Sequence, residues 1–272
     1  MLGALPLVVA VVPMIKYLPE SLSFLTARGR TVEARQLAIR HGIDMDDVAV
    51  DLPPRRAVNS VWHSLRELFD GPRSTTTLLF WIASFAGLLL VYGFATWLPV
   101  MMRSNGYELG SALAFLLVVN LGGIVGFPIA GRIADRIGPT VVALVWFGLT
   151  CAGILVMSMQ MPVIATYIVV FFTGAWLFSA QTMVYASVAA HSQTDYRATA
   201  IGWTSGIGRF GAVFGPWLGG VLIAAGAPQW GFFAFAIAAG VAVMALLVIT
   251  RLDRSRWSSA VPLAASDVPA GH

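Results

Sequence analysis

The chain has 272 residues and a net charge of +4; 58% of the residues are hydrophobic and only 11% are charged, and the mean hydropathy is +0.79. Ordinary soluble domains are roughly 25% charged, so this composition excludes that class and indicates a protein that crosses the lipid bilayer several times. The basic residues follow membrane topology and do not indicate a nucleic-acid partner, and the single cysteine, Cys151, excludes an internal disulfide and cysteine metal sites.

The first 74 residues contain one apolar segment and one charged segment. Residues 2–18 are apolar and near the lower length limit for a membrane span, and we interpret residues 1–18 as a helix that ends on the cytoplasmic side. Residues 19–74 hold eight arginines and eight acidic residues and predict a cytoplasmic linker. Within this linker, residues 31–41 have a helical pattern, and residues 60–69 predict a short amphipathic helix along the membrane surface.

Six further apolar segments are long enough to cross a bilayer, and we expect them to form one six-helix bundle over residues 75–250. Their approximate ranges are 75–102, 110–130, 140–160, 162–190, 197–225 and 229–250. With the first segment the total is seven helices, an odd number. The order suggests an all-α membrane protein made of the last helix of one six-helix bundle and a complete second bundle, so that five helices of the first bundle are expected to be missing.

The connections between these segments alternate in charge. One side receives the linker and most of the arginines, whereas the other receives only Arg103, against Glu108. The positive-inside rule makes the arginine-rich side cytoplasmic, and we expect a multi-pass protein of a bacterial inner membrane. Residues 251–272 are then a cytoplasmic tail, which we expect to be unstructured beyond Arg256.

The cytoplasmic connection between the second and third of the six segments reads GRIADRIG, from Gly131 to Gly138. Here Asp135 could accept hydrogen bonds from an adjacent helix N-terminus and pair with Arg132 and Arg136, closing the cytoplasmic face as a gating loop. A tight turn whose arginines only set the topology is the alternative.

The fifth of the six segments contains an arginine in an apolar, glycine-rich run, AIGWTSGIGRFGAVFGPWLGG, over residues 200–220. Arg209 lies twelve residues into this segment, roughly 18 Å from its start at about 1.5 Å per residue. A guanidinium near the bilayer midplane costs about 2.5 to 3.5 kcal/mol and therefore needs a bundle interior, a water-filled cavity or an anion. We expect it to face an anion; a structural arginine bonded to carbonyls or a carboxylate is the alternative.

Small residues in the same segment recur at helical spacing and predict close helix packing. They form one pair and one ladder: Gly202 with Gly206, and Gly211 with Gly215 and Gly219. Pro216 predicts a kink or break that frees nearby carbonyls.

These motifs resemble a known family. GRIADRIG is similar to the loop signature of the major facilitator superfamily, and LPESLSFL at residues 18–25 is similar to the start of the central loop in its sugar and organic-acid carriers. LLFWIASFAGLLLVYGFATWLPVMM at residues 78–102 and RATAIGWTSGIGRFGAVFGPWLGG at residues 197–220 resemble the aromatic acid:proton symporters of that superfamily. The resemblance implies a twelve-helix carrier that imports benzoate-like anions with protons by alternating access.

Polar and aromatic side chains in the spans are candidates for binding such an anion beside Arg209. The sequence suggests that Asn120 and Gln181 lie at a depth in the membrane similar to that of Arg209, although such side chains more often join helices. Aromatic faces could sandwich a ring, although each is more often packing or an interfacial anchor, the role that suits Trp97 best. These aromatic candidates are Tyr92, Trp97, Phe178 and Tyr185.

Proton coupling needs a titratable group in the pathway, and no acidic residue lies within a predicted span. We therefore expect the proton switch in the missing N-terminal bundle. The alternatives are an inactive membrane fragment or assembly partner, and a carrier of a sugar or an aliphatic acid. An enzyme is not expected, and neither is a cofactor or a metal, because the spans contain no zinc-ligand, paired-carboxylate, serine–lysine or phosphate-binding motif.

Overall fold

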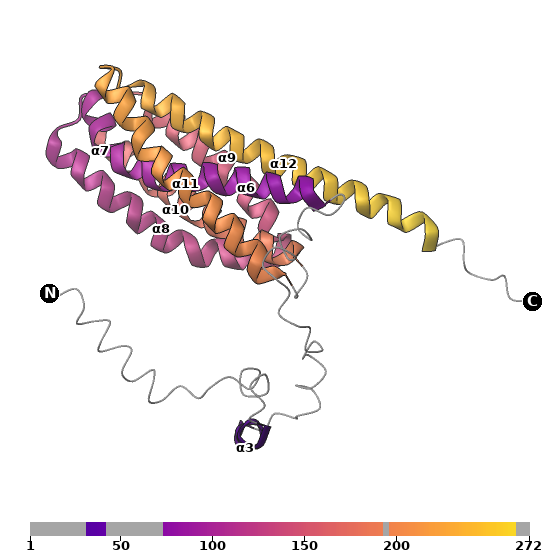
Figure 1. The fold of residues 1–272 in the computed structure, drawn as a ribbon. Helices are drawn as coiled ribbons and strands as arrows, with labels where there is room; N and C mark the ends of the chain where they lie inside the picture. Colours follow the sequence, from indigo (N-terminus) through magenta and orange to yellow (C-terminus); the bar gives the residue numbers. More distant parts are fainter. Residues whose placement is uncertain (1–30, 42–72, 193–195, 265–272) are drawn as a thin grey trace, which may run out of the picture. The chain divides into compact units, whose positions relative to one another are not determined.

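The computed structural model describes most of the chain, which divides into two units, residues 1–59 and residues 60–272. The described residues are 31–41, 73–192 and 196–264 (Figure 1).

The first unit contains one described helix, α3 (Thr31–His41), whose bounds agree with the prediction from the sequence. The expected helix at residues 1–18, and with it the seventh span, lies outside the described residues. The same holds for the expected amphipathic helix at residues 60–69.

The second unit is a bundle of long helices, and no strand occurs in the part of the chain that the structure describes. The first membrane helix has three parts and is followed by five single helices. They are α6 (Arg73–Leu89), the π-helix η2 (Leu90–Phe94) and α7 (Ala95–Ser104), then α8 (Leu109–Ile137), α9 (Pro139–Met157), α10 (Val163–His191), α11 (Arg197–Ala224) and α12 (Trp230–Ala264). Among the described residues six helices are long and apolar enough to cross a membrane, which confirms the six expected spans.

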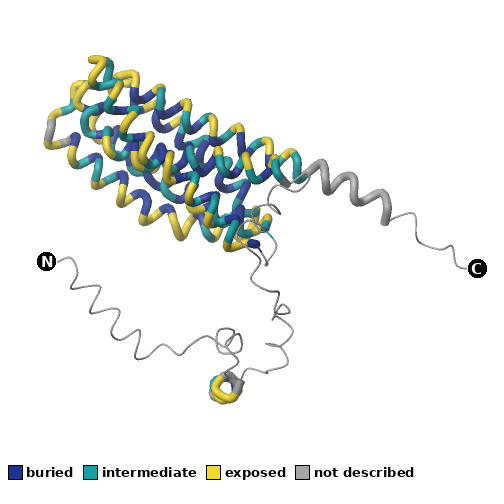
Figure 2. Tube along the Cα trace, in the orientation of Figure 1, coloured by how far each residue is buried: buried dark blue, intermediate teal, exposed yellow. Residues whose placement is uncertain are grey.

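The helices lie side by side and pack as pairs, with α10 against α8 and α9, α11 against α6, and α12 against α9 and α6. Buried residues face the inside of the bundle and exposed residues its outer surface (Figure 2). Large apolar side chains are also exposed, for example Leu117 at 70% and Val213 at 73%. In a lipid environment an apolar outer surface is expected, so helix association depends on close packing.

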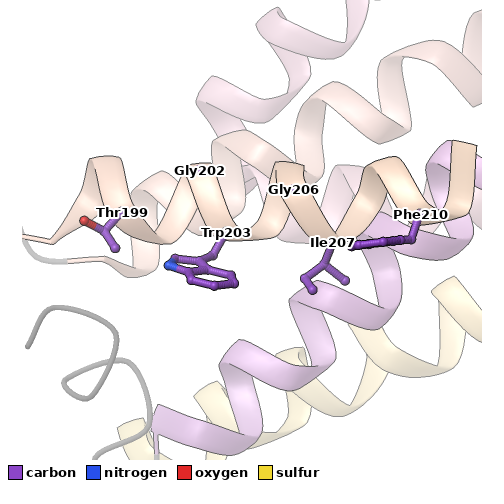
Figure 3. Close-up of a pocket in the computed structure, with 6 residues that line it drawn as sticks. All are labelled: Thr199, Gly202, Trp203, Gly206, Ile207 and Phe210. Atoms are coloured by element: carbon purple, nitrogen blue, oxygen red, sulfur yellow. The ribbon is translucent and has the colours of Figure 1, made fainter. Parts of the chain in front are cut away.

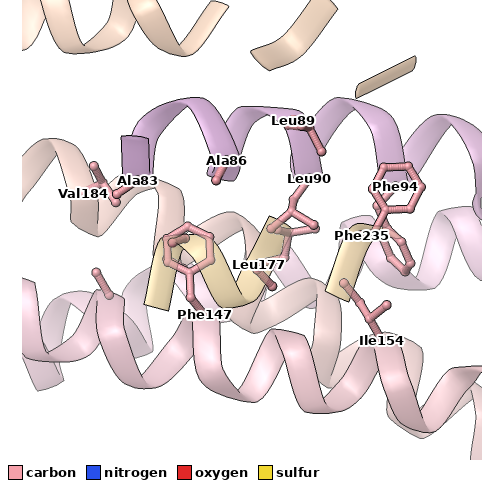
Figure 4. Close-up of a cluster of buried hydrophobic side chains, with 14 of the residues drawn as sticks. Ala83, Ala86, Leu89, Leu90, Phe94, Phe147, Ile154, Leu177, Val184 and Phe235 are labelled. Carbon is pink, nitrogen blue, oxygen red and sulfur yellow. The ribbon is translucent and has the colours of Figure 1, made fainter. Parts of the chain in front are cut away.

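Aromatic and branched side chains fill the centre of the bundle, and several of them are fully buried. Phe94 and Phe235 meet edge to face, with ring centroids 6.1 Å apart, and so join η2 to α12. Phe147 lies in the same cluster (Figure 4). These side chains therefore join the first membrane helix to α9 and α12.

Two helices are longer than the sequence predicts. α8 continues to Ile137, so the residues expected to form a gating loop are its last two turns. The helix ends only at Gly138, whose φ of +86° favours glycine, and Pro139 then starts α9 with a preset φ. α12 continues to Ala264, so part of the tail expected to be unstructured is helical, since no glycine or proline interrupts residues 251–261.

The glycine ladder of α11 packs against α6 and α7, as predicted. A Cβ at Gly211 would overlap the carbonyl oxygen of Phe85, and one at Gly219 would overlap the ring of Trp97. Gly202 and Gly206 differ from the prediction, because both are exposed and a Cβ there would meet nothing within 4 Å. The spacing of small residues permits close packing but does not require a neighbour on that face.

Candidate functional site

Arg209 lies on the flank of α11 and is exposed on the bundle. The buried residues of α11 include the glycine ladder, which faces the first membrane helix, formed by α6, η2 and α7. At about 100° per residue, Arg209 points roughly 120° away from the mean direction of that ladder. It is therefore neither buried between α11 and α6 nor covered by another described helix. Pro216 was expected to kink or break the helix, and α11 continues through it without a break.

The level of Arg209 along the bundle follows from contacts between α11 and α6. Ser84 Oγ on α6 donates a hydrogen bond of 3.0 Å to the carbonyl oxygen of Thr204 on α11. A Cβ at Gly208 would lie 2.5 Å from the same oxygen atom of Ser84 and 2.8 Å from Cδ1 of Leu88. Arg209 follows Gly208 directly, so it lies at the level of Ser84 to Leu88.

Gln181 on α10 lies at this same level. Its side chain is 5% exposed, and its Nε2 donates a 3.4 Å hydrogen bond to Ser84 Oγ. Its Oε1 is buried without a hydrogen-bond partner among the described residues and lies against Gly87, where a Cβ would overlap it. The structure thus brings Gln181 and Arg209 to one level through Ser84, with Gln181 enclosed between helices.

Asn120 does not share that level. It is exposed on α8, and its Nδ2 donates a 2.6 Å hydrogen bond to the carbonyl oxygen of Leu116. The neighbouring Val119 packs on Gly174 of α10, which is seven residues before Gln181. At 5.4 Å per turn this separation is about two turns, or roughly 11 Å along α10. The similar depth suggested by the sequence is therefore not what the helix packing produces.

The aromatic candidates have different surroundings. Tyr92 is 51% exposed and lies in η2, a π-helix, a feature that often marks functional sites. Trp97 is half-buried, and its Nε1 donates a 2.7 Å hydrogen bond to the carbonyl oxygen of Pro216. Phe178 and Tyr185 are half-buried on α10, and Phe178 packs against Gly123 of α8. Of these side chains, Tyr92 is the most accessible.

The residues expected to form the gating loop lie at the end of α8. Arg132, Asp135 and Arg136 are exposed, and Nη1 of Arg132 donates a 3.4 Å hydrogen bond to the carbonyl oxygen of Pro128, four residues back on the same helix. The expected capping of the next helix by Asp135 is not observed, because Gly138 is the N-cap of α9 and no side chain caps it. Asp135 is one helical turn before that cap.

A hollow of about 360 Å³ opens on α11 (Figure 3). It is lined by residues of α11: Thr199, Gly202, Trp203, Gly206, Ile207 and Phe210. Trp203 stacks on Trp81 of α6, with ring centroids 6.1 Å apart. None of the six binding residues predicted from the sequence lines this hollow.

Two groups of polar residues were not predicted. Ser84 gives no signal in the sequence, because one serine in an apolar run looks the same whether it bonds its own helix or another. His191 joins α10 to α12, since its Nε2 lies 2.9 Å from Oδ2 of Asp253, and its Nδ1 lies 2.8 Å from the carbonyl oxygen of Ser187. Within the described ranges no three metal-binding side chains cluster.

Comparisons with known proteins agree with the resemblance seen in the sequence. The model of the Major Facilitator Superfamily matches residues 2–211. The chain is 34% identical to the gentisate transporter of Corynebacterium glutamicum over 75% of its own length and 48% of the relative. It is 30% identical to the benzoate transport protein of Acinetobacter baylyi, over 92% of the chain and 54% of the relative. It is 33% identical to the 4-hydroxybenzoate transporter PcaK of Pseudomonas aeruginosa, over 85% of the chain and 51% of the relative.

The chain thus spans about half the length of these curated relatives. The relatives are named as transporters, which agrees with the expectation of a membrane transporter rather than an enzyme.

Proposed function

This chain belongs to the major facilitator superfamily, and from that premise we propose that it is the C-terminal portion of a secondary carrier for small aromatic carboxylates. The carrier moves its substrate together with protons by alternating access across a bacterial inner membrane. Its other half is an N-terminal six-helix bundle that supplies the proton switch. The names of the relatives support this substrate class, because gentisate, benzoate and 4-hydroxybenzoate each carry a carboxylate on a benzene ring.

The observation that carries the proposal is that Arg209 is exposed within the apolar, glycine-rich part of α11. An arginine at this depth needs an anion or water, and its planar fork matches the two oxygens of a carboxylate. No described residue forms a salt bridge with Arg209; the ion pair found in the described part of the chain joins His191 and Asp253. We assign Arg209 as the residue that binds the substrate carboxylate.

The other candidate residues take different parts in this proposal. Tyr92 and Tyr185 are the side chains that we propose to contact the ring. Gln181 and Trp97 act mainly by fixing helices, since each already donates a hydrogen bond to another helix. Asn120 lies about two turns from Gln181, toward the end of the bundle that carries Arg103, and we propose that it meets the substrate as it enters or leaves.

Gating is proposed for the end of α8. Arg132, Asp135 and Arg136 are exposed there and are free to form ion pairs with the N-terminal bundle when the cytoplasmic side is closed. The proton switch is assigned to the N-terminal bundle because the described acidic residues of this unit lie between the membrane-spanning segments or at their ends. They are Glu108, Asp135 and Asp253.

The test is proton-driven uptake into vesicles. The chain is co-expressed with a matching N-terminal half, and uptake of radiolabelled 4-hydroxybenzoate is measured with and without an inward proton gradient. We expect gradient-dependent uptake, and a fall of about 100-fold in kcat/KM for Arg209→Ala, because truncating one partner of a desolvated charge pair costs about 2 to 5 kcal/mol. Arg103 is an exposed arginine in the last turn of α7. Arg103→Ala is therefore the matched control and should behave like wild type.

The substrate assignment fails if the assembled pair takes up neither this acid nor any of a panel of aromatic carboxylates. Uptake of a sugar or an aliphatic acid instead would replace the substrate class. Unchanged uptake by Arg209→Ala would make the arginine a structural residue.

A further inference from the structure

Ser84 joins the two helices that carry Arg209 and Gln181. Its side chain is fully buried on α6, and its hydroxyl bonds to Thr204 of α11 at 3.0 Å and to Gln181 of α10 at 3.4 Å. We call these two hydrogen bonds the Ser84 bridge. We propose that Ser84 is a positioning residue of the anion site, which fixes the rotation and spacing of the helices bearing Arg209 and Gln181; this inference rests on the proposed function.

The chemistry of the bridge sets the direction of both hydrogen bonds. The carbonyl oxygen of Thr204 can only accept, so the single proton of the Ser84 hydroxyl is donated to it. The hydroxyl oxygen of Ser84 must then accept a hydrogen bond from Gln181, and Nε2 of the amide is the donor. The amide is thereby held with Oε1 turned toward Gly87. One hydroxyl group therefore fixes both the backbone of α11 and the orientation of the Gln181 amide.

On the α11 side, a glycine makes the bridge possible. A Cβ at Gly208 would stand 2.5 Å from Ser84 Oγ, so only glycine lets the two helices approach this closely. Arg209 is the next residue, and any rotation or retreat of α11 moves its guanidinium directly. Binding constellations tolerate errors of only about 0.5 Å or 10–20°, so a small shift of α11 is enough to weaken carboxylate binding.

Three other buried hydroxyl groups in the bundle behave differently. Those of Ser187, Thr150 and Ser179 each bond to a carbonyl oxygen one turn back in their own helix: Met183, Trp146 and Ala175. Such bonds satisfy the hydroxyl without joining helices. The Ser84 hydroxyl instead connects α6 to two other helices at the level of Arg209. Ser187 on α10 is equally buried and so offers a matched control.

The first measurement is the kinetics of uptake in the assembled carrier. Ser84→Ala removes both hydrogen bonds and should raise KM for 4-hydroxybenzoate about tenfold while kcat changes less than about threefold. Ser187→Ala removes one buried hydroxyl that joins no helices and should leave KM within about twofold. Equal effects of the two substitutions would overturn the proposal.

A reciprocal exchange separates the hydroxyl from the space it fills. Gly208→Ser alone should raise KM, because its Cβ would press on Ser84 Oγ. In the Ser84→Ala background the same substitution returns a hydroxyl from the facing helix and should restore KM to within about threefold of wild type. Gly208→Ala in that background fills space without a hydroxyl and should not restore it. If the alanine restores KM as well as the serine does, packing alone explains the site and the proposal is wrong.

A second measurement needs no substrate. Cys151→Ser removes the single cysteine and keeps a hydrogen-bond donor at this position, where Sγ lies 3.3 Å from the carbonyl oxygen of Ala236. Arg209→Cys in this background reports the accessibility of position 209 through its rate of reaction with N-ethylmaleimide. Adding Ser84→Ala should change that rate at least about threefold, and adding Ser187→Ala should not. If no acid is transported, the proposed function fails and this rate alone decides the positioning role.

Discussion

The same substitution, glycine to alanine, should have different effects at two positions of α11. At Gly211 an added Cβ would overlap the carbonyl oxygen of Phe85 and stand 2.9 Å from its carbonyl carbon, where ordinary van der Waals contact begins at 3.4 Å. The clash is with backbone, so α11 and α6 must move apart. A gap of about 0.5 to 1 Å forfeits a quarter to a half of each packing contact along the ladder.

We therefore expect Gly211→Ala to lower the free energy of unfolding by about 2 kcal/mol, within the range for overpacked sites. Gly206→Ala, five residues earlier, meets nothing within 4 Å. It should be neutral or stabilising by up to about 1 kcal/mol, because alanine favours the helix over glycine. The assay is reversible unfolding in mixed micelles with increasing dodecyl sulfate, followed by far-UV circular dichroism. Equal effects of the two substitutions would refute the packing argument.

Three further experiments test other features of the bundle. Trp97→Phe removes the 2.7 Å hydrogen bond to Pro216 and should cost about 1 kcal/mol in the same unfolding assay; an unchanged midpoint would show that this bond contributes nothing. His191→Ala should cost less than about 1 kcal/mol, because its side chain and that of Asp253 are 27% and 38% exposed; adding Asp253→Ala should then cost almost nothing more, and additive losses would argue against the pair. Asp135→Asn should slow uptake without changing the unfolding midpoint, and normal uptake would remove the gating role.

The six membrane helices could be predicted from the sequence because length and hydropathy are local properties. Their ends could not be placed equally well. GRIADRIG carries three charged residues, which suggests a loop, yet nothing in it stops a helix before Gly138 with its positive φ. The same argument explains why α12 continues beyond Thr250.

The candidate site was predicted in part. An arginine within an apolar span is visible in any sequence, and Arg209 was found in this way. The register between helices is not a local property, and it separates Asn120 from Gln181 by about two turns, or roughly 11 Å. Ser84 was missed because its partners lie 97 and 120 residues away in the sequence. Gly202 and Gly206 have the spacing of a packing motif, but no described neighbour lies within 4 Å of either added Cβ.

The central claim is that Arg209 recognises a carboxylate, and competition between an acid and its neutral isostere tests it most directly. In the assembled carrier, inhibition of 4-hydroxybenzoate uptake is measured for benzoate and for benzamide, which have similar shape but differ in charge. We predict that benzoate competes at least about 30-fold better with wild type, as expected for about 2 kcal/mol from one charge-assisted pair. This preference should fall to within about threefold in an Arg209→Gln carrier that retains measurable uptake. An undiminished preference for benzoate in Arg209→Gln would contradict the assignment and place carboxylate recognition elsewhere.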